Sequence, residues 1–219
     1  MSLKEHTVKS YDKDLQSIAG TLDEMLDLVS TSIDMVGEMI TDRHDDYLEK
    51  IAAHDYKINS LDFLIEKKIT AMLAMRQPMA VDLRYIVSAL KVSSNLERVG
   101  DQAKSIIKKI NRIGTDSFDD SVRKSLLAMV SVSKEMVAAS IQAFNDQDSQ
   151  KADYVLQKDD EIDGTYSSLF RILEGGNISK ERLEQIINIL FIAKSFERLA
   201  DHSTNIAEIT KYVVTGETK

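Results

Sequence analysis

The chain has 219 residues, enough for one large domain or two small ones, and 43% of them are apolar, which allows a sizeable core. A formal net charge of −8 disfavours a nucleic-acid binder, which needs basic residues against the phosphate backbone. The lack of cysteine excludes disulfides, thiolate zinc sites and cysteine nucleophiles, and the single proline and eight glycines favour long helices over sheet.

Apolar residues at steps of three and four predict three long amphipathic helices in the first half of the chain. These helices are expected over about Thr7–Arg43, Tyr47–Arg76 and Ala80–Ile113, with a polar turn at Asp42–Asp46. Pro78 ends the second helix or bends the chain there, because proline lacks an N–H group and disfavours a helical residue before it.

The second half predicts three more helices after a boundary at Gly114–Phe118. Asp119 or Asp120 could cap a helix that runs to about Asn145, a polar turn Gln147–Gln150 precedes a helix that runs to about Glu174, and a last helix is expected from Ser179 to about Val214. The residues Gly175–Asn177 tolerate a left-handed backbone and are expected to stop the fifth helix.

The two halves also repeat one another. Leu96-Glu97-Arg98 matches Phe196-Glu197-Arg198, and at an offset of 104 residues Asp55 and Ile58 match Asp159 and Ile162. Self-similarity over about a hundred residues indicates a duplicated unit, and short turns make neighbouring helices antiparallel. We therefore expect an all-α fold of two tandem antiparallel three-helix bundles, formed by residues 1–113 and 119–219 and joined by a linker at 114–118.

No apolar stretch approaches the roughly 18 to 20 residues that are needed to cross a bilayer. The longest candidate, Ile186–Ala193, is short and contains Asn188, and the N-terminal residues lack the apolar region of a signal peptide. We expect a soluble intracellular protein whose membrane contact is peripheral or made through a partner.

The motif Glu-Arg-x-x-Asp occurs twice and places two carboxylates one helical turn apart on the same face. The second helix of each half adds another pair of polar residues at the same spacing. We define the first acidic set as Asp55, Asn59, Glu97 and Asp101, and the second acidic set as Asp159, Asp163, Glu197 and Asp201. Two facing helices that each present two oxygen ligands could bind a hard cation such as Mg²⁺, Mn²⁺, Ca²⁺ or iron.

A simpler interpretation is that these charges form ion pairs or a solvated face. Glu97 could pair with Arg98 of a neighbouring helix, and Asp101 with Lys104. His202 lies about 100° away from Asp201 on the helix and is not counted as a ligand. An enzyme is disfavoured, because no Glu-x-x-His pair, glycine-rich phosphate loop or Gly-x-Ser-x-Gly elbow occurs.

Several ordered motifs over about residues 10–214 resemble those of the PhoU family. They are Arg76-Gln-Pro-Met-Ala-Val-Asp-Leu-Arg84, Leu96-Glu-Arg-Val-Gly-Asp-Gln-Ala103 and Glu197-Arg-Leu-Ala-Asp-His-Ser-Thr-Asn-Ile-Ala-Glu208, together with Asp55-Tyr-Lys-Ile-Asn59 and Asp159-Asp-Glu-Ile-Asp163. The resemblance implies a fold of two tandem three-helix repeats.

The resemblance also implies a cytoplasmic negative regulator of phosphate uptake and of the phosphate regulon. Such proteins are thought to link the ATPase subunit of the phosphate-specific ABC transporter to a membrane sensor histidine kinase, and a homodimer is compatible with this role. Family members bind multinuclear metal clusters through their acidic motifs, which implies iron, zinc, manganese or magnesium at the two acidic sets here. Asn59 departs from a carboxylate, which implies a weaker first site or one with fewer charges, and the motif residues Arg76, Asp82 and Arg84 are candidates for partner binding.

Three alternatives stay open. The chain could serve a different phosphate permease, such as a sodium-coupled one, or it could be a metal-free helical adaptor. A carboxylate–metal enzyme is the third alternative.

Overall fold

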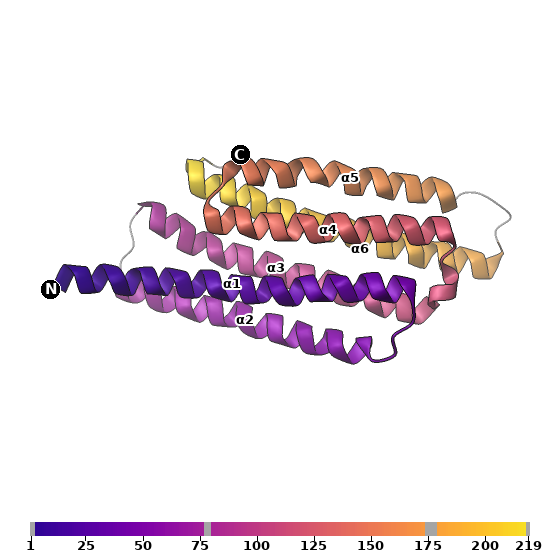
Figure 1. Ribbon diagram of the computed structural model, residues 1–219, viewed down its shortest axis with the longest axis horizontal. Coiled ribbons are helices and arrows are strands. Elements are labelled where there is room, and N and C mark those ends of the chain that lie inside the picture. The colour runs from indigo at the N-terminus through magenta and orange to yellow at the C-terminus, as the bar shows by residue number, and fades with distance from the viewer. Residues whose placement is uncertain (1–2, 77–79, 174–178, 218–219) are drawn as a thin grey trace.

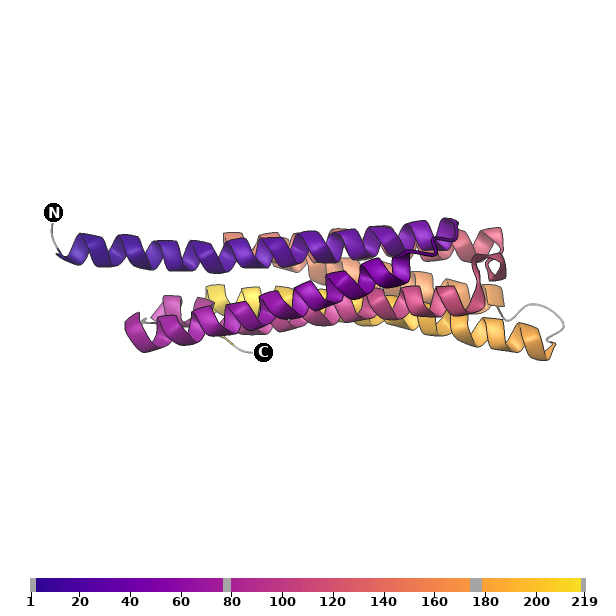
Figure 2. The same cartoon turned by 90° about the horizontal axis from the view of Figure 1, so that it is seen from below.

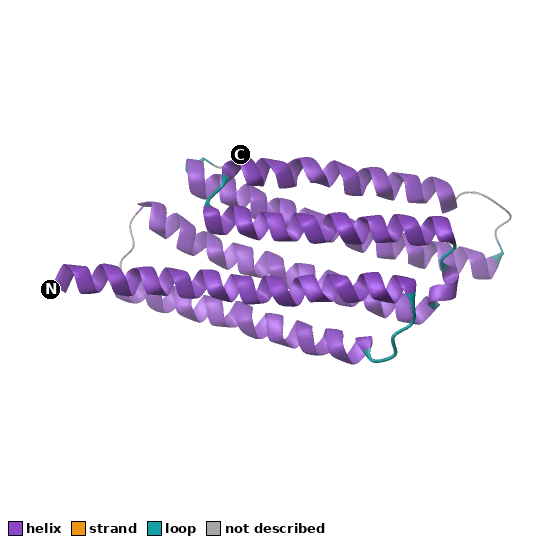
Figure 3. Cartoon of the chain, viewed as in Figure 1, coloured by secondary structure: helices purple, strands orange, loops and turns teal. Residues whose placement is uncertain are grey.

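The computed structural model describes residues 3–76, 80–173 and 179–217, and over these residues the chain is almost entirely helical, with no strand (Figure 3). The helices are α1 (Leu3–Thr41), α2 (Tyr47–Arg76), α3 (Ala80–Ile113), the short 3-10 helix η1 (Thr115–Ser117), α4 (Asp120–Asp146), α5 (Ser149–Leu173) and α6 (Lys180–Thr215). The all-α prediction is confirmed. The bounds of α2 and α3 are those expected from the spacing of apolar residues.

Two helix starts follow the capping residues that the sequence offers. The side chain of Asp119 accepts a hydrogen bond from the backbone N–H of Val122 at 2.9 Å, and the hydroxyl of Ser179 accepts one from the N–H of Arg182 at 3.2 Å. Each cap satisfies an amide at a helix N-terminus that has no partner within the helix. The expected roles of Pro78 and of the segment 174–177 lie outside the described residues.

The six helices run along the long axis of the molecule (Figure 1). α1 packs against α4 and α3 packs against α6, so the two halves meet along two helix pairs. α2 packs on α1 and α3, while α5 packs on α4 and α6. The N-terminal turns of α1 reach past the neighbouring helices (Figure 2). Each half is thus a three-helix bundle, and the bundles lie side by side.

Apolar side chains from both halves form one core, which includes Leu22, Ile33 and Phe196, each fully buried. The ring of Tyr85 in α3 stacks on that of Phe144 in α4, with 4.8 Å between centroids. Burial of this kind is the main favourable term in folding, and aromatic pairs add to it. The core therefore holds the two bundles in one fixed arrangement.

An apolar window long enough to cross a bilayer occurs in α4, which corrects the expectation that the short segment Ile186–Ala193 is the longest apolar candidate. By length and composition α4 alone among the described helices could cross a membrane, but half of its apolar window is buried inside the protein. Its residues Val122, Leu126 and Met129 belong to the core. The apolar character of α4 is accounted for by its packing.

Candidate metal and partner sites

The first acidic set lies between α2 and α3. The side chain of Asp55 on α2 is only 15% exposed, and its Oδ2 forms a close ion pair with Nζ of Lys104 on α3. The side chain of Glu97 on α3 is 17% exposed. The packing of α2 against α3 therefore brings Asp55 and Glu97 to the same partly buried seam.

Arg98 lies over the other carboxylates of this set. Its Nε is 3.4 Å from Oε2 of Glu97, and its Nη1 is 3.5 Å from Oδ2 of Asp101. The arginine is thus on the same helix as both carboxylates, and Lys104 reaches Asp55 rather than Asp101. Of the two ion pairs considered from the sequence, Glu97 does pair with an arginine, but with Arg98 of its own helix, and the pair between Asp101 and Lys104 does not form, because Lys104 reaches across to α2.

The environment of Glu97 disfavours its ionised form. Burial is the main cause that raises the pKa of Glu97, and the neighbouring carboxylate of Asp101 raises it further. Arg98 acts in the opposite direction, while Asp62 and Asp55 on α2 add to the rise. Asp62 was not identified from the sequence, and the hydroxyl of Ser93 donates a hydrogen bond to its Oδ1 at 2.6 Å.

Asn59, the remaining member of the first set, is exposed. Its Nδ2 donates a hydrogen bond of 2.9 Å to the backbone carbonyl of Asp55 in the same helix. The amide is therefore engaged with its own helix, and it brings no negative charge to the seam.

The second acidic set lies between α5 and α6. Burial first, then the carboxylates of Asp163 and Asp201, raise the pKa of Asp159, and Glu197 adds to this effect. Glu197 forms a close ion pair with Lys194, whose side chain is 45% exposed. Asp159 and Asp201 form no ion pair with a described residue. The second set thus gathers carboxylates from two helices with little positive charge among them.

His202 takes no part in the second set, as expected from its direction on the helix. It is half-buried, and burial lowers its pKa. Its Nδ1 lies 3.0 Å from Oδ1 of Asn95 on α3. His202 therefore links α6 to α3 and does not point to the carboxylates of α5.

The two sets differ in how well they fit a metal ion. Among the described residues, no group of three or more His, Asp or Glu side chains is arranged closely enough to hold an ion as it stands. In the second set no described residue forms an ion pair with Asp159 or Asp201, so their charge is of the kind that a cation compensates. In the first set Lys104 already compensates Asp55, so the fit is poor.

The candidates for partner binding lie at the start of α3. Asp82 is exposed and Arg84 is half-buried, while the side chain of Arg76 lies outside the described residues. Burial first, then the Asp82 carboxylate, raise the pKa of Tyr11 on α1 to about 12. The guanidinium of Arg84 lies against Gly216 at the end of α6, so closely that a Cβ at position 216 would be 3.1 Å from its Nη1.

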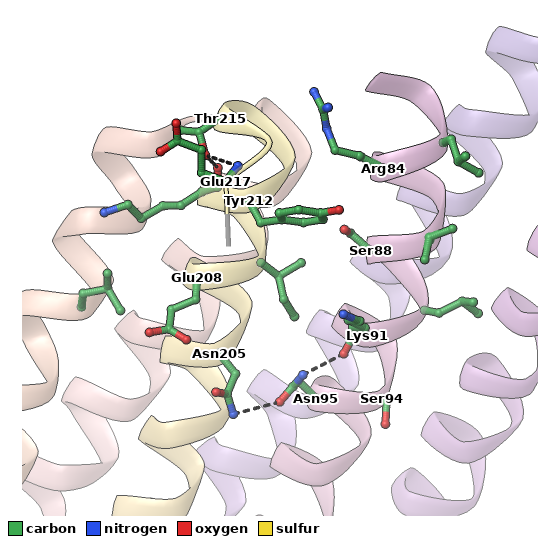
Figure 4. A pocket seen from close by; sticks show the side chains of 16 residues that line it. Arg84, Ser88, Lys91, Ser94, Asn95, Asn205, Glu208, Tyr212, Thr215 and Glu217 are labelled. Atoms are coloured by element: carbon green, nitrogen blue, oxygen red, sulfur yellow. Dashed lines mark hydrogen bonds between the residues drawn. The ribbon is translucent and has the colours of Figure 1, made fainter. Parts of the chain in front are cut away.

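Arg84 also lines a groove of about 1030 Å³ between α3 and the C-terminal half of α6 (Figure 4). Its apolar lining includes Leu83, Val87, Leu90 and Ile209, and its polar lining includes Arg84, Lys91, Asn95, Asn205, Glu208 and Tyr212. No member of either acidic set lines this groove. Local sequence patterns do not predict this groove, because it arises where the two halves meet.

A family model described as the PhoU domain matches the chain twice, over residues 22–110 and 126–210. A curated relative from Caulobacter vibrioides, named phosphate-specific transport system accessory protein PhoU homolog, is 34% identical over 216 residues. That match covers 98% of this chain and 94% of the relative. A relative of the same name from Clostridium acetobutylicum is 32% identical, with 96% of this chain and 97% of the relative covered.

Two solved structures have the same fold. The crystal structure of PhoU from Pseudomonas aeruginosa matches with a TM-score of 0.85 at 27% identity, covering 94% of this chain and all of that one. The crystal structure of the phosphate transport system regulatory protein PhoU from Streptococcus pneumoniae matches with a TM-score of 0.81, also at 27% identity, covering 97% and 99%. The likeness thus extends over both halves of the chain.

Proposed function

This chain belongs to the PhoU family, and we propose on that basis that it is a cytoplasmic regulator of phosphate uptake that acts by binding rather than by catalysis. The observation that carries the proposal is the match of the family model to both halves, with relatives aligned over nearly the whole length. An accessory protein of phosphate transport needs surfaces for partners, and we propose the groove beside Arg84 as one of them.

We propose that its partners are the ATPase subunit of a phosphate ABC transporter and a sensor histidine kinase, and that it lowers expression of the phosphate regulon. Regulation then follows from differential affinity for the partners in their different states. The test is deletion of the gene in its host, with a reporter of a phosphate-starvation gene measured at high phosphate. The reporter should rise on deletion and return to its low level with the wild-type gene. An unchanged reporter contradicts the proposal.

Co-purification distinguishes the transporter that the protein serves. The tagged full-length chain should retain the ATPase subunit encoded in the same genome. Retention of a sodium-coupled permease in its place supports the first alternative above. Light scattering of the purified chain measures whether it is a homodimer.

We also propose that the second acidic set binds a metal ion, with Asp159 and Asp201 among its ligands. What supports this is that the exposed Asp201 on α6 disfavours ionisation of Asp159 on α5, and that neither carboxylate forms an ion pair in the described part of the chain. Oxygen ligands of this kind suit iron, manganese or magnesium, and zinc also accepts carboxylates.

Elemental analysis of protein purified without chelators tests the metal. The double variant Asp159→Asn with Asp201→Asn should lose the metal, whereas Asp116→Asn, an exposed carboxylate on η1, should keep it. Wild-type protein that regulates the reporter but contains no metal supports the metal-free adaptor. The non-catalytic role is contradicted if the metal-loaded wild type hydrolyses or oxidises test substrates and the double variant does not.

A further inference from the structure

The two acidic sets occupy equivalent positions in the two halves, but a lysine beside the first set is replaced by an uncharged residue beside the second. Position 104 in the first half corresponds to position 204 in the second, where the residue is Thr204. The hydroxyl of Thr204 donates to the backbone carbonyl of Asp201 at 2.9 Å. Lys104 instead crosses from α3 to α2 and forms an ion pair with Asp55. In the part of the chain that the structure describes, Asp159, the equivalent of Asp55, therefore has no counterpart of Lys104 paired with it.

The Lys104–Asp55 pair is protected from solvent on both sides. The lysine side chain is 25% exposed and the aspartate side chain is 15% exposed, so water screens their attraction only in part. A metal ion that entered the first set would have to displace an ammonium group that is tethered to the same protein. That displacement leaves Lys104 without its partner in a partly buried position, which is unfavourable.

The rest of the first set is also compensated from within. Arg98 lies 3.4 Å from Glu97 and 3.5 Å from Asp101, and Asn59 supplies no charge. Metal affinity at oxygen sites depends on the number of charged ligands, so the first set is the poorer site.

The second set keeps its charge. Among the described residues, Arg198, the equivalent of Arg98, forms no ion pair with Glu197 or Asp201, and Lys194 alone pairs with the set, through a side chain that is 45% exposed. Asp163 replaces Asn59 and adds a further carboxylate. The duplication has thus produced one set with its own cations and one set that remains largely uncompensated.

We infer that Lys104 acts as a built-in counter-ion that excludes metal from the first acidic set, so that metal binding is confined to the second set. This inference rests on the metal binding proposed above. Lys104 is then a specificity-determining residue, because it decides which of two duplicated sets takes a metal ion. The tethered ammonium and a metal ion compete for the same carboxylate of Asp55.

The experiment exchanges the two equivalent residues in the full-length chain. Wild type, Lys104→Thr and Thr204→Lys are stripped with chelator and titrated with Mn²⁺, with calorimetry for affinity and elemental analysis after gel filtration for metal per chain. Lys104→Thr should gain a second class of Mn²⁺ site that Asp55→Asn removes again. Thr204→Lys should weaken binding to the second set by about tenfold or more. Lys108→Thr, an exposed lysine on the same helix, is the matched control and should behave as wild type.

Two readouts separate the inference from the proposed function, and circular dichroism verifies that each variant is folded. If Asp55→Asn reduces the amount of bound Mn²⁺ as much as Asp159→Asn does, the inference about Lys104 is wrong, but the proposal of metal binding stands. If wild type binds no Mn²⁺ but Lys104→Thr does, the role of Lys104 is supported, and the proposal of metal binding at the second set is wrong. If neither wild type nor Lys104→Thr binds Mn²⁺ although both are folded, the inference about Lys104 and the proposed metal binding are both wrong.

Discussion

The ion pair between Lys104 and Asp55 should stabilise the metal-free protein by a measurable amount. An exposed pair contributes about 0–1 kcal/mol, and breaking a fully buried pair costs about 3–5 kcal/mol. Because the two side chains are 25% and 15% exposed, the pair lies between these limits, and we expect a coupling free energy of about 2 kcal/mol. For a chain of this length, that corresponds to a fall of about 4–8 °C in Tm for Lys104→Met.

A double-mutant cycle measures this coupling. Wild type, Lys104→Met, Asp55→Asn and the double variant are unfolded with urea in the presence of chelator, and far-UV circular dichroism follows the loss of helix. The chelator removes metal, so the cycle reports only on the protein's own ion pair. The double variant should be more stable than the sum of the two single effects implies.

The pair between Lys194 and Glu197 provides the matched control. It spans one turn of α6, and its side chains are 45% and 23% exposed, so water screens it more strongly. We expect a coupling of about 0.3–0.5 kcal/mol, the range for helical surface pairs. A Lys104–Asp55 coupling no larger than that of the control would refute the reasoning, because partial burial would then have no energetic consequence.

Three further predictions concern stability. Phe144→Ala should lower the free energy of unfolding by about 3–5 kcal/mol, because it leaves a cavity in the core and removes the stacking on Tyr85; urea unfolding measures this loss, and a loss below about 1 kcal/mol would mean that the site is loosely packed. Asp119→Ala should cost about 1 kcal/mol, seen as a Tm lowered by about 2–4 °C, because the first turn of α4 loses its cap, whereas Asp119→Asn should retain most of the stability. The third depends on pH: the pKa of Asp159 is raised above its ordinary value of 3.8, so its stabilising contribution is complete below that value and is lost as the pH rises through the higher pKa of the folded state. Because burial first, and then the carboxylate of Asp163, disfavour the ionised form, Asp159→Asn without metal should be more stable than wild type at neutral pH, the like-charge pair with Asp163 accounting for about 0.2–0.5 kcal/mol. The difference should vanish in acid, and equal stability at all pH values would contradict this reading of the cluster.

The likeness to PhoU proteins and the helical fold could both be recognised from local patterns. Steps of three and four between apolar residues identify α2 and α3 with their observed bounds, and Asp119 and Ser179 mark helix starts. Such features are readable because a helix is specified by residues that are near in the sequence. The doubled Glu-Arg-x-x-Asp motif likewise identifies α3 and α6 as equivalent helices.

The acidic sets could be predicted only in part. The spacing places Glu97 beside Asp101, and the equivalence of the halves suggests that helices α2 and α5 contribute to them. The sequence pattern does not show that Asn59 donates a hydrogen bond to its own helix, or that Lys104 forms an ion pair with Asp55 on α2 rather than with Asp101. Both outcomes depend on how α2 is rotated against α3, which periodicity along one helix does not describe.

The sequence by itself determined the helices, their order and their duplication, because these follow from contacts within a few residues and from apolar faces of regular period. Only the tertiary structure decided which acidic set has its own cation and where a groove opens between α3 and α6. These properties depend on contacts between residues that are far apart in the chain. The two sets carry nearly the same motif, and the difference between them arises from Lys104, from the position of Arg98 beside Glu97 and Asp101, and from Asn59 in place of Asp163.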